Sequence, residues 1–214
     1  MSKSPLVAGQ RAYSVGPCKW SHRGQAQRAA ADTSRMTTAP LPPISLRPVA
    51  LRDGTTVSVR PLQRRDRAAI LRFLKGLSPR STYMRFCCGG TDLAKVAQDF
   101  IDLGPHRQGV VAFGAHGEIV GHAEYIVISA NTAEVAIVVA DAVQGVGLAT
   151  RLIEHLAELG RANGLSRFVA EVLPGNEAML AVFSRGCGAA VFDSEHGHSV
   201  EFGIGATVPL ALTA

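Results

Sequence analysis

Two glycines, Gly145 and Gly147, separate a continuous apolar stretch from a long amphipathic one, and they restrict the possible folds of this 214-residue chain more than any other feature. The preceding stretch, "TAEVAIVVAD", is apolar on both faces of a strand, which is typical of a strand inside a sheet. The following stretch places Leu152, Leu156 and Leu159 on one helical face. A strand inside a sheet is therefore expected to enter a helix through a turn that needs bare backbone.

The hydrophobic period changes repeatedly around this junction. Extended segments are predicted at 49–62, with a turn at Asp53-Gly54, at 109–128, with a turn at His116-Gly117, and at 132–141, 166–173, 189–194 and 198–205. Helices are predicted at 64–77, 91–104, 148–161 and 176–185. This order predicts an α+β domain with a mixed, mostly antiparallel sheet flanked by helices, in which the strand at 132–141 is central.

Residues 1–48 lack apolar periodicity and are predicted to be a disordered, basic, proline-containing extension, followed by a domain at 49–206 and a tail at 207–214. Residues 1–47 hold seven lysines and arginines and one aspartate, so the rest of the chain is close to neutral. A nucleic-acid groove needs its charge on or next to the folded surface, and we expect no nucleic-acid partner. The open alternatives for the extension are an upstream start before Met36, a transit peptide and a basic arm.

Cysteine spacing and hydropathy bear on metal binding, disulfide formation and membrane association. The four cysteines form neither a CxxC pair nor a metal-ligand spacing with histidine, so we expect no metal and no disulfide framework. No apolar run approaches the roughly 18–20 residues that span a bilayer, so no membrane association is expected. A cytoplasmic location is the expectation.

A strand that enters a helix through small residues can bind an anion, because the first helical amides have no partner inside the helix and the helix dipole adds positive charge there. The turn has no lysine and no GK[ST] follows it, which disfavours a nucleoside-triphosphate loop. A dinucleotide fingerprint is also disfavoured, because Ala149 and Thr150 stand where it needs its third glycine. A glycine turn without any ligand is the open alternative.

The segment Gln144-Gly145-Val146-Gly147-Leu148-Ala149 resembles the Q/R-x-x-G-x-G/A signature of the GNAT acetyltransferases. The segment "PGNEAMLAVF" is similar to a second motif of that family. The segments "LRDGTTVSVRPL", "LSPRSTYMRF" and "AEVAIVVAD" look like the bacterial Pat-type protein lysine acetyltransferases. The resemblance covers about residues 49–204.

This resemblance implies acetyl-CoA as co-substrate, without a metal. It implies that backbone groups at the glycine turn hold the diphosphate and that strand and helix residues contact the pantetheine arm. The implied cofactor-binding residues are Val138, Val139, Gln144, Gly145, Val146, Gly147, Leu148, Ala149, Thr150, Asn176 and Phe183. The alternative role for Asn176 is that of a helix N-cap, and both roles can hold.

The resemblance also places the catalytic glutamate at Glu134, ten residues before Gln144. A lysine amine, with a pKa of roughly 10.4, must lose a proton before it attacks a thioester, and apolar neighbours would raise the pKa of Glu134 towards the working range. Glu124 on the preceding strand is the rival base, and His122 is a third candidate. The alternative for either glutamate is a solvated carboxylate.

Three features of the sequence depart from the family pattern: Phe183, the strip "GCGAAV", and the pair Val143 and Val146. Phe183 replaces a tyrosine that acts as an acid in many members, but a thiolate can leave without one. The strip "GCGAAV" lacks an aromatic residue, and we interpret its Cys187 as a packing residue. Val143 replaces an aromatic residue, and Val146 replaces a residue that is often basic, which would weaken CoA binding modestly.

The leading hypothesis is an acetyl-CoA-dependent N-acetyltransferase that modifies a lysine of a protein substrate, for which an acyl-CoA synthetase is a candidate. A GNAT enzyme that acetylates a small amine is the first alternative, and it would favour an acidic pocket. A non-catalytic acyl-CoA-binding regulatory domain is the second alternative, and it would bind CoA without turnover.

Overall fold

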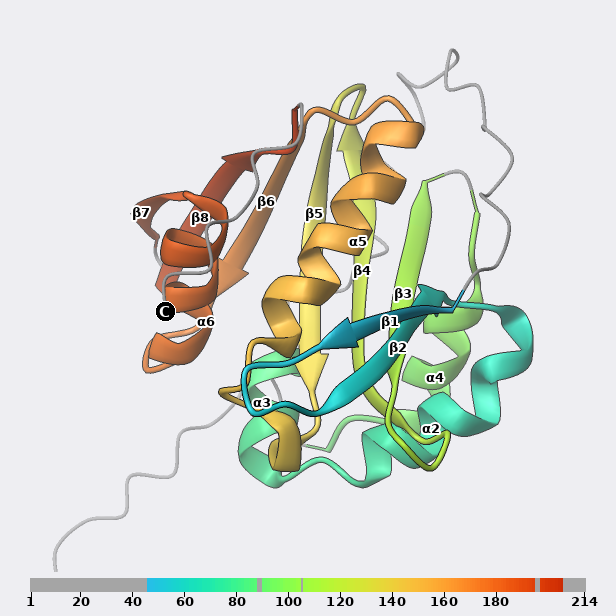
Figure 1. Cartoon of the computed structure of the whole chain (residues 1–214). Helices are drawn as coiled ribbons and strands as arrows, with labels where there is room; N and C mark the ends of the chain where they lie inside the picture. Colours follow the sequence, from blue (N-terminus) through green and yellow to red (C-terminus); the bar gives the residue numbers. More distant parts are fainter. Residues whose placement is uncertain (1–45, 88–89, 105, 195–196, 206–214) are drawn as a thin grey trace, which may run out of the picture.

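The computed structural model describes residues 46–87, 90–104, 106–194 and 197–205, which form one eight-stranded sheet with helices on both faces (Figure 1). The strands are β1 (Arg47–Ala50), β2 (Thr56–Pro61), β3 (Arg107–Phe113), β4 (Ile119–Ser129), β5 (Thr132–Val139), β6 (Arg167–Val172), β7 (Ala190–Ser194) and β8 (Gly197–Gly203). The helices are α2 (Arg67–Lys75), α3 (Pro79–Phe86), α4 (Leu93–Ile101), α5 (Leu148–Ala162) and α6 (Glu177–Ala181). Short 3-10 turns occur at Arg64–Asp66 and Asp141–Val143, and a π-helical turn occurs at Val182–Gly186.

The strand order is β1-β2-β3-β4-β5-β6-β8-β7, which confirms the predicted mixed sheet and the central position of β5. Every neighbouring pair is antiparallel except β5 and β6, which run parallel. Parallel neighbours require a crossover connection, and α5 provides it. The glycine turn therefore lies between the central strand and the crossover helix.

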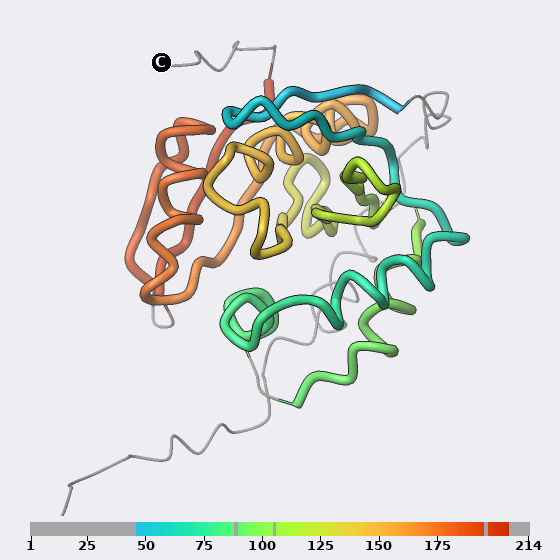
Figure 2. The backbone as a smooth tube through the Cα atoms, turned by 60° about the horizontal axis from the view of Figure 1, so that its bottom comes forward, coloured from blue at the N-terminus to red at the C-terminus, as the bar shows by residue number. Residues whose placement is uncertain are grey.

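Each face of the sheet has its own hydrophobic core. On one face, α5 buries Leu152 and Leu156 against Tyr125 and Phe168 of the sheet. On the other face, α2 and α4 bury a smaller cluster that includes Phe100. Figure 2 shows α5 and the group of α2, α3 and α4 on opposite sides of the sheet. None of the helices in the described residues is both long and apolar enough to cross a membrane.

Three elements differ from the predictions. Helix α3 was not predicted, because its sequence carries no apolar stripe. Strand β1 begins at Arg47, inside the predicted extension, and as an edge strand it tolerates Pro48. The predicted helix at 176–185 is divided into α6 and the π-helical turn. The rest of the predicted extension and the predicted tail at 207–214 lie outside the described residues.

Candidate active site

The parallel strands β5 and β6 separate in the middle of the sheet. They pair only from Thr132↔Arg167 to Glu134↔Val169, although β5 continues to Val139 and β6 to Val172 (Figure 1). Beyond Glu134 the facing edges of the two strands no longer pair with each other, and unpaired strand edges offer hydrogen-bonding groups to an extended ligand. Glu134 stands where the separation begins, and the glycine turn follows where β5 ends.

The register of β4 and β5 decides which backbone groups face the separation. The Ala140 N–H donates to the Val120 carbonyl at 2.8 Å, and bonding groups alternate along an antiparallel ladder. The backbone groups of Val138 are therefore directed to β4, whereas those of Val139 are directed towards β6. In agreement, the Val139 carbonyl accepts a hydrogen bond from Nε2 of Gln144 at 3.1 Å. Of the two valines predicted to contact the cofactor arm, Val139 has its backbone on the diverging side.

The glycine turn has the conformation that its sequence suggested. Gly145 and Gly147 have φ angles of 78° and 93°, which L side chains rarely adopt. Gly147 is the N-cap of α5, and no side chain caps this helix. The first amides of α5, which begins Leu148-Ala149-Thr150, have no partner within the helix. A Cβ atom on Gly145 would meet no atom within 4 Å, so the turn is open on this side of Gly145.

Helix α3 is fastened to the start of this turn. Asp141 accepts hydrogen bonds from the Ser78 N–H at 3.0 Å and from the Ser78 and Ser81 hydroxyls, each at 2.7 Å. These bonds lower the pKa of Asp141. Gln144 donates from Nε2 to the Ser81 hydroxyl oxygen at 3.1 Å. Sequence reasoning missed this contact, although Ser78 followed by Pro79 is a recognisable helix start.

Glu134 is half-buried on β5, directly opposite Ile126 of β4. Burial raises the pKa of its carboxyl group, the guanidinium of Arg85 opposes that rise, and the carboxylates of Glu171 and Glu124 add to it. A carboxylate with a raised pKa is a better proton acceptor at neutral pH than an ordinary one. Glu134 therefore combines a position where the two strands begin to separate with a raised pKa.

Glu124 has a different environment, although it lies on the same face of the sheet. Its side chain is 2% exposed, and Oε1 and Oε2 accept from Arg85 Nη2 at 2.6 Å and from Arg107 Nε at 2.8 Å. Both carboxylate oxygens are thus engaged by guanidinium groups, which suits a buried counter-ion better than a proton acceptor. Neither arginine was identified from the sequence. His122, the third candidate, is fully buried, and burial lowers its pKa to about 3.

The remaining predicted residues lie on the far side of the separated strands. The Asn176 side chain accepts a hydrogen bond from the Met179 N–H at 3.4 Å, so it caps α6. The Phe183 ring is 2% exposed and packs on Phe202, with the ring centroids 5.6 Å apart. Cys187 is half-buried, and burial raises the pKa of its thiol to about 12. A thiol with this pKa stays protonated near neutral pH, which agrees with its interpretation as a packing residue.

Metal ligation finds no support in the part of the chain that the structure describes. No group of three or more His, Cys, Asp and Glu residues with a metal-binding arrangement occurs among these residues.

Comparison with known proteins agrees with this geometry. Residues 80–189 match the acetyltransferase (GNAT) family. An acetyltransferase of Pseudomonas aeruginosa is 30% identical over 136 residues, which cover 61% of this chain and 73% of that protein. The GNAT domain of S. lividans PAT has a TM-score of 0.68 and 32% identity, over 74% of this chain and 96% of that chain.

A further similar structure is a cAMP-binding acyltransferase from Mycobacterium smegmatis, with a TM-score of 0.56 and 27% identity. The similarity covers 87% of this chain and 53% of that chain, so the present chain corresponds to about half of the mycobacterial protein. The family match, the relatives and the glycine turn between β5 and α5 lead to one conclusion. The chain belongs to the GNAT family of acetyltransferases and is an acyltransferase.

Proposed function

We propose that the protein transfers an acetyl group from acetyl-CoA to a lysine side chain of a protein, with Glu134 as the general base. One observation carries this proposal: Glu134, half-buried and with a raised pKa, stands where β5 and β6 separate, on the strand that ends at the open glycine turn. The two ends of this strand segment suit the two ends of acetyl-CoA. The glycine turn would bind the diphosphate, and the carboxylate would act as the base next to the thioester.

The residues at the turn fit a diphosphate. The open side of Gly145 leaves room for phosphate oxygens, and the uncapped amides of α5 would donate to them. The backbone of Val139 would lie along the coenzyme arm once the Gln144 side chain releases its carbonyl. When bound, acetyl-CoA supplies the thioester carbonyl that an amine attacks and the thiol that leaves.

The first step that the protein's own residues carry out is the removal of a proton from the acceptor amine. A lysine ammonium, with a pKa of roughly 10.4, cannot attack a carbonyl, so Glu134 takes one proton from it, directly or through water. The raised pKa of Glu134 brings the pKa values of base and amine closer together, which assists the transfer. Phe183 carries no hydroxyl group, so when the C–S bond breaks the CoA thiolate, whose thiol has a pKa of about 8.5, leaves without help from this position and takes up the second proton that the attacking nitrogen releases.

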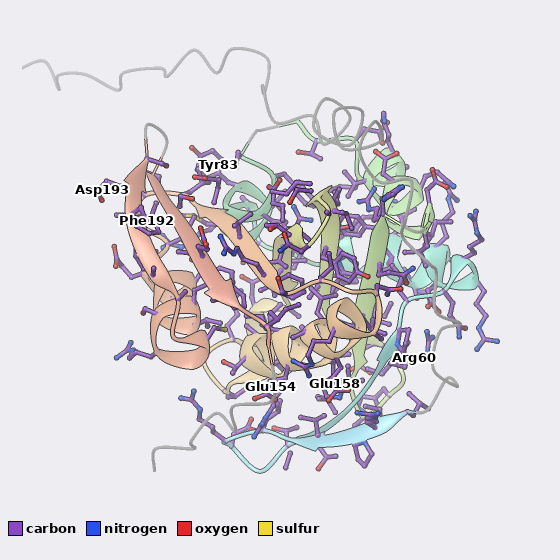
Figure 3. All side chains as sticks on the ribbon, turned by 90° about the horizontal axis from the view of Figure 1, so that it is seen from above. Arg60, Tyr83, Glu154, Glu158, Phe192 and Asp193 are labelled. Carbon is purple, nitrogen blue, oxygen red and sulfur yellow. The ribbon has the colours of Figure 1, made fainter. Side chains whose placement is uncertain are left out.

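A protein acceptor is favoured by the surroundings of Glu134. Glu171 lies two residues beyond Val169, the partner of Glu134, and therefore on the same face of the sheet. The exposed aromatic rings of Phe192 on β7 and Tyr83 on α3 lie on the side of the sheet away from Glu154 and Glu158 of α5 (Figure 3). Carboxylates attract the lysine ammonium, and exposed aromatic side chains are typical of protein-binding surfaces.

The experiment compares acetyl transfer from labelled acetyl-CoA to an acyl-CoA synthetase and to a panel of small amines. Glu134→Gln should reduce transfer at least about 100-fold, because the base is lost while the shape is kept. The matched control is Glu158→Gln, an exposed glutamate of α5 that should leave the rate unchanged. Equal transfer rates for Glu134→Gln and wild type would show that Glu134 is not the general base. If only the small amines are acetylated, the acceptor is a small amine and not a protein lysine.

A further inference from the structure

The tight turn between β1 and β2 contacts the glycine turn, although the two are far apart in the sequence. The Arg52 N–H donates to the Val146 carbonyl at 3.0 Å. The turn itself is closed by hydrogen bonds from the Leu51 N–H to the Thr55 carbonyl at 2.8 Å and from the Gly54 N–H to the Leu51 carbonyl at 3.1 Å. Arg52 is thus held beside the N-terminus of α5 by backbone bonds that do not depend on its side chain.

The side chain of Arg52 runs along Gly147. A Cβ atom on Gly147 would lie 3.3 Å from Nε and 3.9 Å from Cζ of Arg52, so the guanidinium group lies next to the N-cap of α5. Arg52 is exposed and forms no ion pair with another described residue. Its neighbour Asp53 uses Oδ1 to accept from the Thr55 N–H at 3.0 Å. The guanidinium of Arg52 is therefore a positive charge at the turn that no carboxylate of the described residues neutralises.

The other arginine at this end of α5 is already engaged. Arg151 donates from Nη1 to the Glu154 carboxylate at 2.9 Å. Helix α5 has no acidic residue in its first turn, although negative charge is favoured there. An arginine beside the positive end of a helix is electrostatically unfavourable by itself, and it becomes favourable when an anion lies between the two.

We propose that Arg52 is a phosphate-binding residue of the coenzyme site, in which its guanidinium pairs with a phosphate group of CoA held at the glycine turn. This inference rests on the proposed function, which supplies the coenzyme. Val146 stands in the glycine turn at a position that is often basic in the family, and Arg52 would supply the positive charge that Val146 lacks. Arg52 lies outside residues 80–189, which match the family. The β1–β2 turn is then part of the coenzyme site.

The test is calorimetric binding of CoA and of dephospho-CoA, which lacks the 3′-phosphate, to the full chain without any acceptor. Arg52→Met should bind CoA about tenfold more weakly, because a charge-assisted bond is lost, and its affinity should depend less on salt concentration. Arg52→Lys should restore part of the affinity. The matched control is Arg47→Met, an exposed arginine of the same hairpin that pairs with Glu158, and its affinity should equal that of wild type.

The two ligands locate the pairing. Equal losses with CoA and dephospho-CoA place the guanidinium on the diphosphate, and a loss with CoA alone places it on the 3′-phosphate. Unchanged dissociation constants for both ligands in Arg52→Met overturn the inference and leave the proposed function intact. If wild type binds neither ligand, the proposed function itself fails. The thermal midpoint of ligand-free Arg52→Met should not fall, because the backbone bond to Val146 is kept, and a fall would indicate a structural role instead.

Discussion

Glu124 and Glu134 lie on neighbouring strands and point to the same face of the sheet, yet their surroundings give them different properties. Two guanidinium groups hold Glu124 as a buried carboxylate, whereas Glu134 has partial burial and two nearby carboxylates that favour its neutral form. The same contrast leads to a prediction for each residue.

The pH dependence of catalysis should report the pKa of Glu134. The base must be ionised to accept a proton, so the rate should fall as pH decreases through this raised pKa. The Glu171→Gln substitution removes a negative charge that raises the pKa of Glu134, so the acidic limb should move to lower pH. Rate–pH profiles of the two proteins measure this shift. A shift to higher pH would contradict the assignment of the limb to Glu134.

Glu124 should be important for stability. Glu124→Gln leaves two buried or nearly buried arginines without their carboxylate, and breaking a buried pair in this way typically costs about 3–5 kcal/mol. Urea unfolding measures the change in the free energy of unfolding. The control is Glu154→Gln on α5, whose partly exposed pair with Arg151 should contribute at most about 0.5 kcal/mol. Similar small losses in both variants would mean that the Glu124 cluster is not a buried ion pair in solution.

At the scale of elements, the position of α5 depends on a close approach to β6 and to the segment after β8. Gly160 is buried on the helix face that touches Phe168 and Ile204. A Cβ atom at this position would lie 2.9 Å from Phe168 Cζ and 2.9 Å from Ile204 Cδ1. The absence of a side chain thus lets this part of the helix pack directly on the aromatic ring.

Gly160→Ala should therefore destabilise the protein, by about 1–3 kcal/mol, because the added methyl group overpacks the core. In an exposed helix the same change would stabilise by roughly 0.5–1 kcal/mol. Gly104→Ala is the control, since no atom lies within 4 Å of its added Cβ and its φ is not positive. Thermal or urea unfolding distinguishes the outcomes, and a gain in stability for Gly160→Ala would show that α5 shifts at little cost.

At the scale of the whole molecule, the fully buried His122 couples folding to pH. Its ring stacks on Phe100 with centroids 4.2 Å apart, and neither ring nitrogen has a hydrogen-bond partner among the described residues. Desolvation lowers its pKa to about 3; the charge of Glu124 opposes this effect, and Arg85 and Arg107 reinforce it. The imidazole is therefore neutral in the folded protein at every pH where GNAT chemistry is expected.

Acidification should destabilise the fold through His122. The unfolded chain binds a proton near the usual histidine pKa of 6.5, whereas the folded chain binds it only near 3, so between these values the unfolded state holds more protons. The free energy of unfolding should then fall by up to about 1.4 kcal/mol per pH unit from this residue. Urea unfolding at pH 7.5 and 5 should show a smaller loss for His122→Leu than for wild type, whatever its absolute stability. The exposed His116→Gln should behave as wild type, and an unchanged loss in His122→Leu would contradict the prediction.

Much of the site could be predicted because its signals are local. The positive φ of Gly145 and Gly147, the apolar strand before them and the amphipathic helix after them follow from neighbouring residues, and the structure has all three. Helix α3 was missed because hydrogen bonds to Asp141 and the Arg85–Glu124 ion pair hold it, rather than an apolar stripe. Arg52 was missed because no local pattern shows that a turn near residue 53 meets a turn near residue 146.

The sequence by itself determined the alternation of strands and helices, the backbone conformation of the glycine turn and the family to which the chain belongs, because periodicity and glycine preferences act over a few residues. Only the tertiary structure decided which glutamate is neutralised by arginines, which valine turns its backbone to the separated strands and which arginine lies beside the turn. These outcomes depend on sheet register and on contacts between distant segments. The interactions that set pKa values and charge pairing act through space, so the order of the residues along the chain does not reveal them.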